Sequence, residues 1–241
     1  KKIKVLALQV HSATNEPMMS LFQADRVLSI NKKTSIYFPQ IFSKREEVPV
    51  GSRLFDRYRF NYRSEVFKPT EKNLLVLLGN TLHPNGNYYG TLHNKLYKEF
   101  LDDLIKISKN LKTWKFYFLH HKNFHSNYEI NYLLNSPFIK LDHNLNVYSA
   151  SLKHLFVVSF SSTVVTELYT YHPNIYLYSP NNKSPFRVSS DNFRMIFSYS
   201  RLMQSIANTE INASKKLTKH IYSENFAIDD FDERIYKSCL K

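Results

Sequence analysis

The stretch NLLVLLGN, residues 73–80, decides the fold, because it is a continuous apolar run that ends in glycine and asparagine. An apolar run without polar alternation is typical of a central strand that is buried on both faces of a parallel sheet. We therefore expect a core strand here, and we expect Gly79 and Asn80 to lie at the carboxyl edge of the sheet, where its ligands would bind.

The residues that follow alternate between helical and strand patterns. Apolar residues at helical spacing predict an amphipathic helix that ends near Asn110; they are Tyr97, Phe100, Leu101, Leu104, Ile105 and Leu111. Four more strands are predicted at KFYFLHH (115–121), FIKL (138–141), HLFVVSF (154–160) and NIYLYSP (174–180), with short helices at 127–135, 147–152 and 164–171. This alternation predicts an α/β fold, a Rossmann-like parallel sheet of five strands with flanking helices.

The flanking segments are harder to interpret. Short apolar runs at 4–8 and 26–30 predict two more strands, and residues 17–24 predict a short helix between them. The polar stretch 42–72 is expected to be a linker or a surface excursion. Beyond Pro185 we expect helices near 192–206, 212–220 and 229–239. Because the chain begins with Lys and runs directly into a strand, we expect it to be a C-terminal fragment.

Composition excludes several classes of function. The 241 residues include only four glycines, too few for a Gly-rich dinucleotide fingerprint or a P-loop. The single cysteine, Cys239, excludes internal disulfides and zinc–cysteine clusters, and favours a reducing, cytoplasmic setting. No apolar run is long enough to cross a bilayer. The formal net charge of +13 is compatible with nucleic acid or an anionic membrane surface as a partner.

Polar residues follow nearly every predicted strand, at the sheet edge where α/β proteins bind ligands. They are Gly79, Asn80 and Thr81, then His120, His121 and Lys122, then Asp142, His143 and Asn144, and finally Ser161, Ser162 and Thr163. A purely structural sheet needs only turn-forming residues at these places. The pattern therefore favours a polar ligand.

The sequence SFSSTVVTE, residues 159–167, carries the most specific signal. Ser161, Ser162 and Thr163 lie at the start of a predicted helix, where hydroxyls, free N–H groups and the helix dipole can hold a phosphate without glycine. The alternative is an ordinary Ser/Thr N-cap, for which one hydroxyl is enough. Glu167, on the same helical face as Thr163, is either a surface acid or an acceptor for ribose hydroxyls.

The histidines do not predict a metal site. His120, His121 and His125 have no carboxylate or cysteine at useful spacing, and adjacent residues of a strand point to opposite faces. We expect one of His120 and His121 to contact phosphate or act as a base, and the other to pack. His11 follows the first strand and is either a catalytic acid or base, or a loop residue.

Several short motifs together resemble the C-terminal part of a GT-B glycosyltransferase. They are LQVHS, ADRVLSINK, VPVGSRLFD, LLGN, LHHKN and VVSFSSTVVTE. Within that class they are most similar to bacterial capsule and surface-polysaccharide enzymes related to polysialyltransferases, Kdo capsule transferases and CDP-glycerol glycerophosphotransferases. Two differences from the family pattern are that LQVHS replaces a Gln-His-Gly order and that HHKN has no proline after its histidines.

The resemblance implies a role for each of these positions. Ser161, Ser162 and Thr163 would hold the donor phosphate, with Glu167 at or beside the ribose. His120 or His121 would lie at the nucleotide phosphate and His11 in the cleft between domains. The same resemblance implies that residues 1–65 are the end of the acceptor-side domain and a connector, that 66–210 form the nucleotide-sugar domain, and that 211–241 return toward the first domain.

The resemblance implies a metal-independent transferase that needs no cofactor beyond its nucleotide-sugar donor, and a glycan or lipid-linked acceptor at the inner membrane face. Four alternatives stay open: a glycerophosphotransferase of the same fold, a nucleotide-sugar epimerase, a non-catalytic nucleotide-binding subunit and a nucleic-acid-binding protein. Scattered rather than clustered lysines argue against specific nucleic-acid recognition.

Overall fold

The structure is a computed structural model that describes residues 6–8, 26–29, 46–49, 67, 69–78, 91–120, 127–144, 146–160, 162, 165, 168, 172–182 and 195–211. The chain divides into two compact units. One consists of Lys1–Ser64 with Leu217–Lys241, and the other is Glu65–Lys216. Each unit contains a parallel sheet of its own.

The first unit contains a three-stranded sheet. Its strands are β1 (Leu6–Leu8), β2 (Arg26–Ser29) and β3 (Glu46–Pro49), in the order β1-β2-β3 with parallel pairing throughout. β1 and β2 confirm the strands predicted from the apolar runs. β3 corrects the expectation of a linker between 42 and 72: its backbone pairs with β2, although two of its four residues are glutamates.

The second unit contains a six-stranded parallel sheet in the order β6-β5-β4-β7-β8-β9. The strands are β4 (Asn73–Leu77), β5 (Lys115–Leu119), β6 (Ile139–Leu141), β7 (Phe156–Ser159), β8 (Ile175–Tyr178) and β9 (Met195–Ile196). The first strand of this unit, β4, lies in the interior of the sheet and pairs with both β5 and β7. The predicted α/β, Rossmann-like parallel sheet with flanking helices is confirmed.

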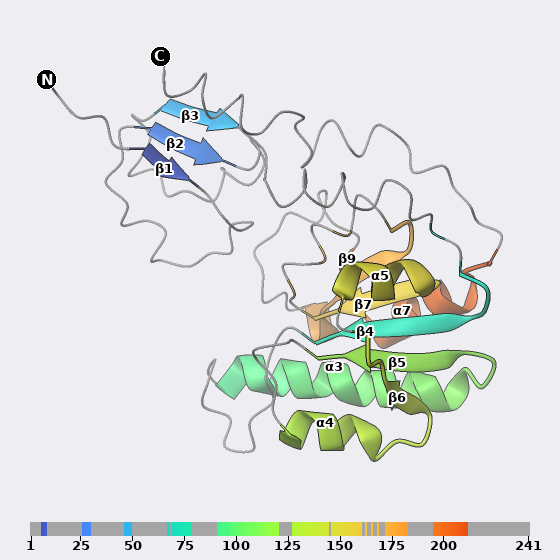
Figure 1. The fold of residues 1–241 in the computed structure, drawn as a ribbon. Helices are drawn as coiled ribbons and strands as arrows, with labels where there is room; N and C mark the ends of the chain where they lie inside the picture. The colour runs from blue at the N-terminus through green and yellow to red at the C-terminus, as the bar shows by residue number, and fades with distance from the viewer. Residues whose placement is uncertain are drawn as a thin grey trace, which may run out of the picture. The chain divides into compact units, whose positions relative to one another are not determined.

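Helices lie on both faces of this sheet. They are α3 (Thr91–Asn110), α4 (Asn127–Leu134), α5 (Val147–Lys153) and α7 (Tyr199–Ala207), and a short 3-10 helix, η3, spans Pro180–Asn182. α3 and α4 cover one face and α5 lies on the other (Figure 1). Within the part of the chain that the structure describes, no helix is both long and apolar enough to cross a membrane.

The hydrophobic core lies between the sheet and α3. Leu74, Leu75 and Val76 of β4 have no exposed surface, so this strand is covered on both faces, as its unbroken apolar run predicts. Six residues of α3 at spacings of three and four complete the core: Leu96, Tyr97, Phe100, Leu101, Leu104 and Ile107. Burial of this apolar surface is the main favourable contribution to the packing of α3 on the sheet.

The prediction of five strands is wrong by one. The segment 192–206 was expected to be helical, but Met195–Ile196 form a sixth strand that pairs with β8, and α7 begins only at Tyr199. Ser198 explains where that helix starts, because its side chain accepts a hydrogen bond from the backbone N–H of Arg201. The helices predicted at 17–24, 212–220 and 229–239 lie outside the described residues.

Candidate functional site

The candidate site is the carboxyl edge of the six-stranded sheet where β4 and β7 meet. From β4 the chain builds outward to β5 and β6, and then crosses to β7 and continues to β8 and β9 on the other side. In open α/β sheets, ligands bind outside the carboxyl ends of the strands at this reversal of strand order. The pairing of Leu77 with Ser159 marks the point.

Ser159, the last residue of β7, joins the two strands at this point. Its buried hydroxyl donates a 2.7 Å hydrogen bond to the carbonyl oxygen of Leu77 in β4. Ser159 Oγ also accepts a 3.2 Å hydrogen bond from the backbone N–H of Ser162. One hydroxyl therefore fixes the end of β4 and the turn that follows β7.

The turn after β7 uses part of its own hydrogen-bonding capacity. Because the N–H of Ser162 donates to Ser159, this amide is engaged within the turn. The carbonyl oxygen of Ser162 accepts from the N–H of Val165 at 3.1 Å, as expected where a helix begins. Ser162 is half-buried, and its assignment to the phosphate stays a prediction. Ser161, Thr163 and Glu167 lie outside the described residues.

The other predicted site residues are described only in part. His120 follows β5 directly and is half-buried at the carboxyl edge. One strand, β4, lies between β5 and β7. Its assignment to the phosphate position stays a prediction. The remaining predicted site residues lie outside the described part of the chain; they are His11, Gly79, Asn80, His121 and Lys122.

The polar run after β6 has a structural explanation. The backbone N–H of Asn144 donates to Asp142 Oδ1 at 2.8 Å, and that of Asn146 donates to Asn144 Oδ1 at 3.1 Å. Asn146 then caps α5, because its Oδ1 accepts from the backbone N–H groups of Tyr148 and Ser149. These side chains build successive turns, so their polarity does not require a ligand.

An aromatic cluster lies beneath the junction of β4 and β7. The ring of Phe160, immediately after β7, lies 5.4 Å from the ring of Tyr97 and 5.6 Å from that of Phe100. The Tyr97 hydroxyl donates a hydrogen bond to the carboxylate of Glu129 in the first turn of α4. Burial and this carboxylate together raise the pKa of Tyr97 well above its ordinary value.

Sequence reasoning missed Glu129. The signal was available, because Glu129 lies four residues before the buried Leu133 and therefore on the apolar face of α4. A carboxylate on a buried helical face needs a hydrogen-bond donor. Tyr97 supplies one.

Among the described residues, no group of three or more His, Cys, Asp or Glu side chains is arranged to hold a metal ion. Two of the three histidines considered for metal binding, His121 and His125, lie outside those residues. Metal independence stays a prediction.

Comparison with known proteins gives a likeness of structure and none of sequence. No model of a protein family matches the chain, and no curated protein sequence matches it. The Staphylococcus aureus MnaA–UDP structure matches with a TM-score of 0.59 at 11% identity, over 98% of this chain and 68% of that one. The chain has the fold of this protein.

Two further solved structures have the same fold. UDP-GlcNAc 2-epimerase from Neisseria meningitidis, bound to UDP-GlcNAc, matches at a TM-score of 0.59 and 9% identity over 99% of this chain and 70% of that one. The Methanocaldococcus jannaschii UDP-GlcNAc 2-epimerase, in complex with UDP-GlcNAc and UDP, matches with a TM-score of 0.53 at 13% identity. This match covers 90% of this chain and 61% of that one. The likeness supports the predicted GT-B type of fold. The chain spans about two thirds of the length of these proteins.

Proposed function

We propose that the chain binds a nucleotide-activated sugar at the carboxyl edge of its six-stranded sheet and transfers the sugar to a capsular or cell-surface polysaccharide. The observation that carries the nucleotide site is the junction of β4 and β7, where Ser159 holds the turn that leads into the Ser-Ser-Thr sequence. The solved structures of this fold that contain UDP or UDP-GlcNAc support a uridine nucleotide as the first ligand to test.

The proposed chemistry follows the charge that develops during transfer. An acceptor hydroxyl oxygen bonds to the anomeric carbon, while the bond from that carbon to the phosphate oxygen breaks and the nucleotide leaves with the electron pair. We assign the hydroxyls of Ser161, Ser162 and Thr163 to the phosphate oxygens, where they stabilise the departing charge. His120, His121 or Lys122 would supply a further donor or positive charge, and Glu167 would accept from the ribose hydroxyls.

The acceptor oxygen must lose its proton as the new bond forms, and we assign this general-base role to His11. Gly79 and Asn80 would line the same edge after β4. In this proposal the reaction needs neither a metal ion nor a cofactor. Its setting is the cytoplasm, at the inner membrane face, with a glycan or lipid-linked acceptor as the second substrate.

Isothermal titration of the full chain with UDP, CDP, GDP and CMP tests the nucleotide site. We expect one of these to bind, and we expect Ser162→Ala combined with Thr163→Ala to raise its Kd by about a hundredfold, the loss for two hydrogen bonds to a charged group. The matched control is Thr70→Ala with Thr113→Ala, two exposed hydroxyls at the opposite edge of the sheet. Equal Kd values for the two double variants would refute the phosphate assignment.

The competing function is epimerisation of the nucleotide sugar, which the fold shared with UDP-GlcNAc 2-epimerases favours. An epimerase acts on the donor alone, whereas a transferase consumes it only with an acceptor. Proton NMR of the sugar after incubation without any glycan separates the two: a new epimer supports epimerisation. Donor that stays intact until an acceptor glycan is added, and then releases nucleotide, supports transfer.

A further inference from the structure

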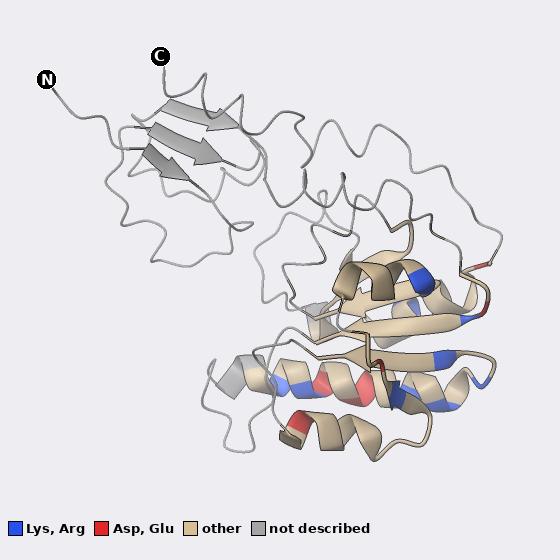
Figure 2. Ribbon diagram, viewed as in Figure 1, with Lys and Arg blue, Asp and Glu red and all other residues tan. Residues whose placement is uncertain are grey.

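The amino edge of the six-stranded sheet, opposite the candidate site, carries a concentration of positive charge. Five lysines lie within three residues of the start of one of four neighbouring strands, and we call them the amino-edge patch: Lys72, Lys112, Lys115, Lys140 and Lys153. Among the described residues of these connections, the one carboxylate is Glu71, which forms an ion pair with Lys115. Figure 2 shows blue segments gathered along this edge of the sheet.

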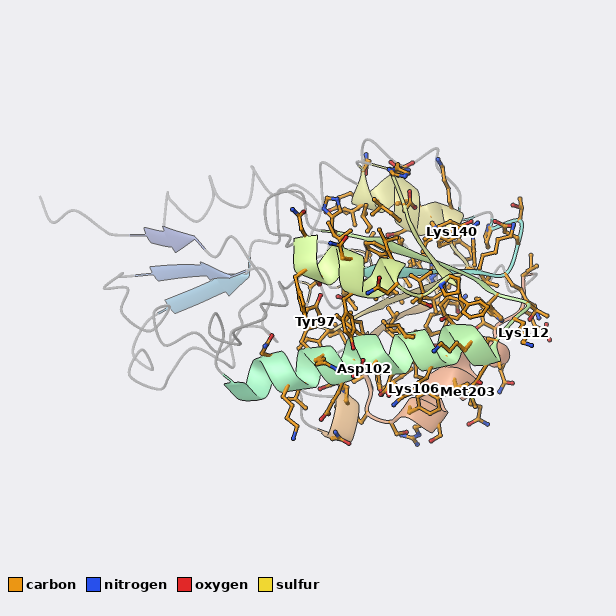
Figure 3. The ribbon with its side chains drawn as sticks, turned by 90° about the horizontal axis from the view of Figure 1, so that it is seen from below. Tyr97, Asp102, Lys106, Lys112, Lys140 and Met203 are labelled. Atoms are coloured by element: carbon orange, nitrogen blue, oxygen red, sulfur yellow. The ribbon has the colours of Figure 1, made fainter. Side chains whose placement is uncertain are left out.

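The strand order makes this patch continuous. The lysines lie near the starts of β6, β5, β4 and β7, which are consecutive neighbours in the sheet; Lys140 is the second residue of β6. Lys140 of β6 is in register with Tyr117 of β5. Because Tyr117 is two residues after Lys115 in the same strand, Lys115 and Lys140 project from the same face of the sheet. In Figure 3, Lys112 lies at the end of α3 away from Tyr97, and Lys140 lies toward that same side.

Apolar side chains protrude beside these charges. Leu134, at the last position of α4, is 46% exposed, and Phe138, just before β6, is 43% exposed. Leu134 begins the stretch of chain that leads from α4 to β6, and Phe138 ends it, two residues before the exposed Lys140. Exposed apolar side chains close to basic ones suit a partner that combines negative charge with an apolar phase.

We propose that the amino-edge patch, with Leu134 and Phe138, docks on an anionic lipid surface. Lipid headgroups supply the negative charge for the lysines, and the acyl boundary accepts the leucine and phenylalanine side chains. A nucleic acid would match the charge, but it offers an aliphatic side chain such as Leu134 no comparable environment. Docking through this edge leaves the carboxyl edge, where we propose that the nucleotide binds, facing away from the lipid.

The test is sedimentation of the full chain with vesicles of equal parts phosphatidylcholine and phosphatidylserine, compared with phosphatidylcholine alone. We expect binding only to the anionic vesicles, and we expect it to weaken with added salt. The triple variant Lys112→Gln, Lys140→Gln, Lys153→Gln should bind about a hundredfold more weakly, given roughly a fivefold factor for each lysine near an anionic surface. The matched control replaces Lys95, Lys98 and Lys106, three exposed lysines of α3, with glutamine, and should bind like the wild type.

A second variant pair tests the apolar contribution. Leu134→Asn with Phe138→Asn should weaken vesicle binding at high salt as well as at low salt, because it removes buried apolar area rather than charge. Equal losses in the patch and control triple variants would overturn the proposal, as would tighter binding to a DNA duplex than to the anionic vesicles. Vesicle binding needs no nucleotide, so its failure is distinguishable from failure of the proposed function.

Discussion

The hydroxyl of Ser159 donates a 2.7 Å hydrogen bond to the carbonyl oxygen of Leu77, so a side chain of β7 holds the end of β4. These two strands belong to the opposite halves of the sheet. The same hydroxyl accepts from the N–H of Ser162, at the start of the turn to which we assign phosphate binding. A single buried group thus connects the stability of the sheet with the shape of the candidate site.

We predict that Ser159→Ala lowers the free energy of unfolding by about 1–3 kcal/mol, because the buried carbonyl of Leu77 and the partly buried N–H of Ser162 lose this partner. Urea denaturation measures this change. The control is Ser151→Ala, because the buried Ser151 hydroxyl donates to the carbonyl of Val147, four residues earlier in the same helix. That carbonyl keeps its helical backbone donor, so the control should cost little. Equal costs for the two variants would contradict the role given to Ser159.

Two asparagines hold the backbone of Leu155, just before β7, and provide a second prediction. Asn73 Oδ1 accepts from the Leu155 N–H at 2.8 Å, and Asn174 Nδ2 donates to the Leu155 carbonyl at 3.0 Å. Asn73→Ala should lower the free energy of unfolding by about 2–4 kcal/mol, since Asn73 also donates to the carbonyl of Lys153. Asn110→Ala is the comparison for thermal unfolding and should cost less, because the exposed Asn110 side chain donates to the hydroxyl of Tyr199 rather than to a buried backbone group.

A third prediction concerns acid and His154. Burial lowers the pKa of this histidine below its ordinary 6.5, despite the opposing effects of Asp142 and of the 2.7 Å hydrogen bond from Nδ1 to the carbonyl of Ala150. Below pH 6.5 the unfolded chain therefore binds a proton that the folded chain does not. The free energy of unfolding decreases as the pH is lowered from 6.5 to the pKa of His154 in the folded chain. Urea midpoints measured across this range should fall less steeply in His154→Gln, which removes the titrating imidazole.

If His154→Gln keeps the wild-type dependence of the urea midpoint on pH, the buried imidazole does not contribute to the acid sensitivity.

The fourth prediction concerns the pair of Tyr97 and Glu129. Tyr97→Phe removes a hydroxyl donor from a buried carboxylate and should lower the free energy of unfolding by about 2–4 kcal/mol. Tyr132→Phe is the matched control, because its hydroxyl donates to Asp102 in a partly exposed setting, and it should cost less than half as much. A double-mutant cycle with Glu129→Gln measures the coupling; a coupling energy near zero would contradict the importance of this hydrogen bond.

The apolar patterns predicted most of the second unit, since burial leaves a direct mark on sequence. β4 shows why: every residue of Leu74–Leu77 is apolar and buried, and no other element accommodates such a run so readily. β3 and β9 left no comparable mark. β3 is held by backbone pairing in spite of Glu46 and Glu47, and β9 has only two residues, too few to show a period.

The candidate site was harder to predict than the fold. Sequence position indicated which residues follow each strand, but not which of their polar groups are used internally. The polar run with Asp142 and Asn144 was predicted to be part of a ligand-binding edge, whereas both side chains accept from backbone N–H groups two residues ahead and so build turns. No local pattern distinguishes Ser159 from its neighbours, because its partner Leu77 lies 82 residues earlier in the chain.

The outermost strands of the six-stranded sheet are also its shortest, with three residues in β6 and two in β9. An edge strand exposes unpaired backbone groups that can template pairing with another molecule. Edges this brief present very few such groups, while the long apolar strands stay enclosed between neighbours. The fold thereby protects its most aggregation-prone segments against fibril-like assembly through the order in which its strands are arranged.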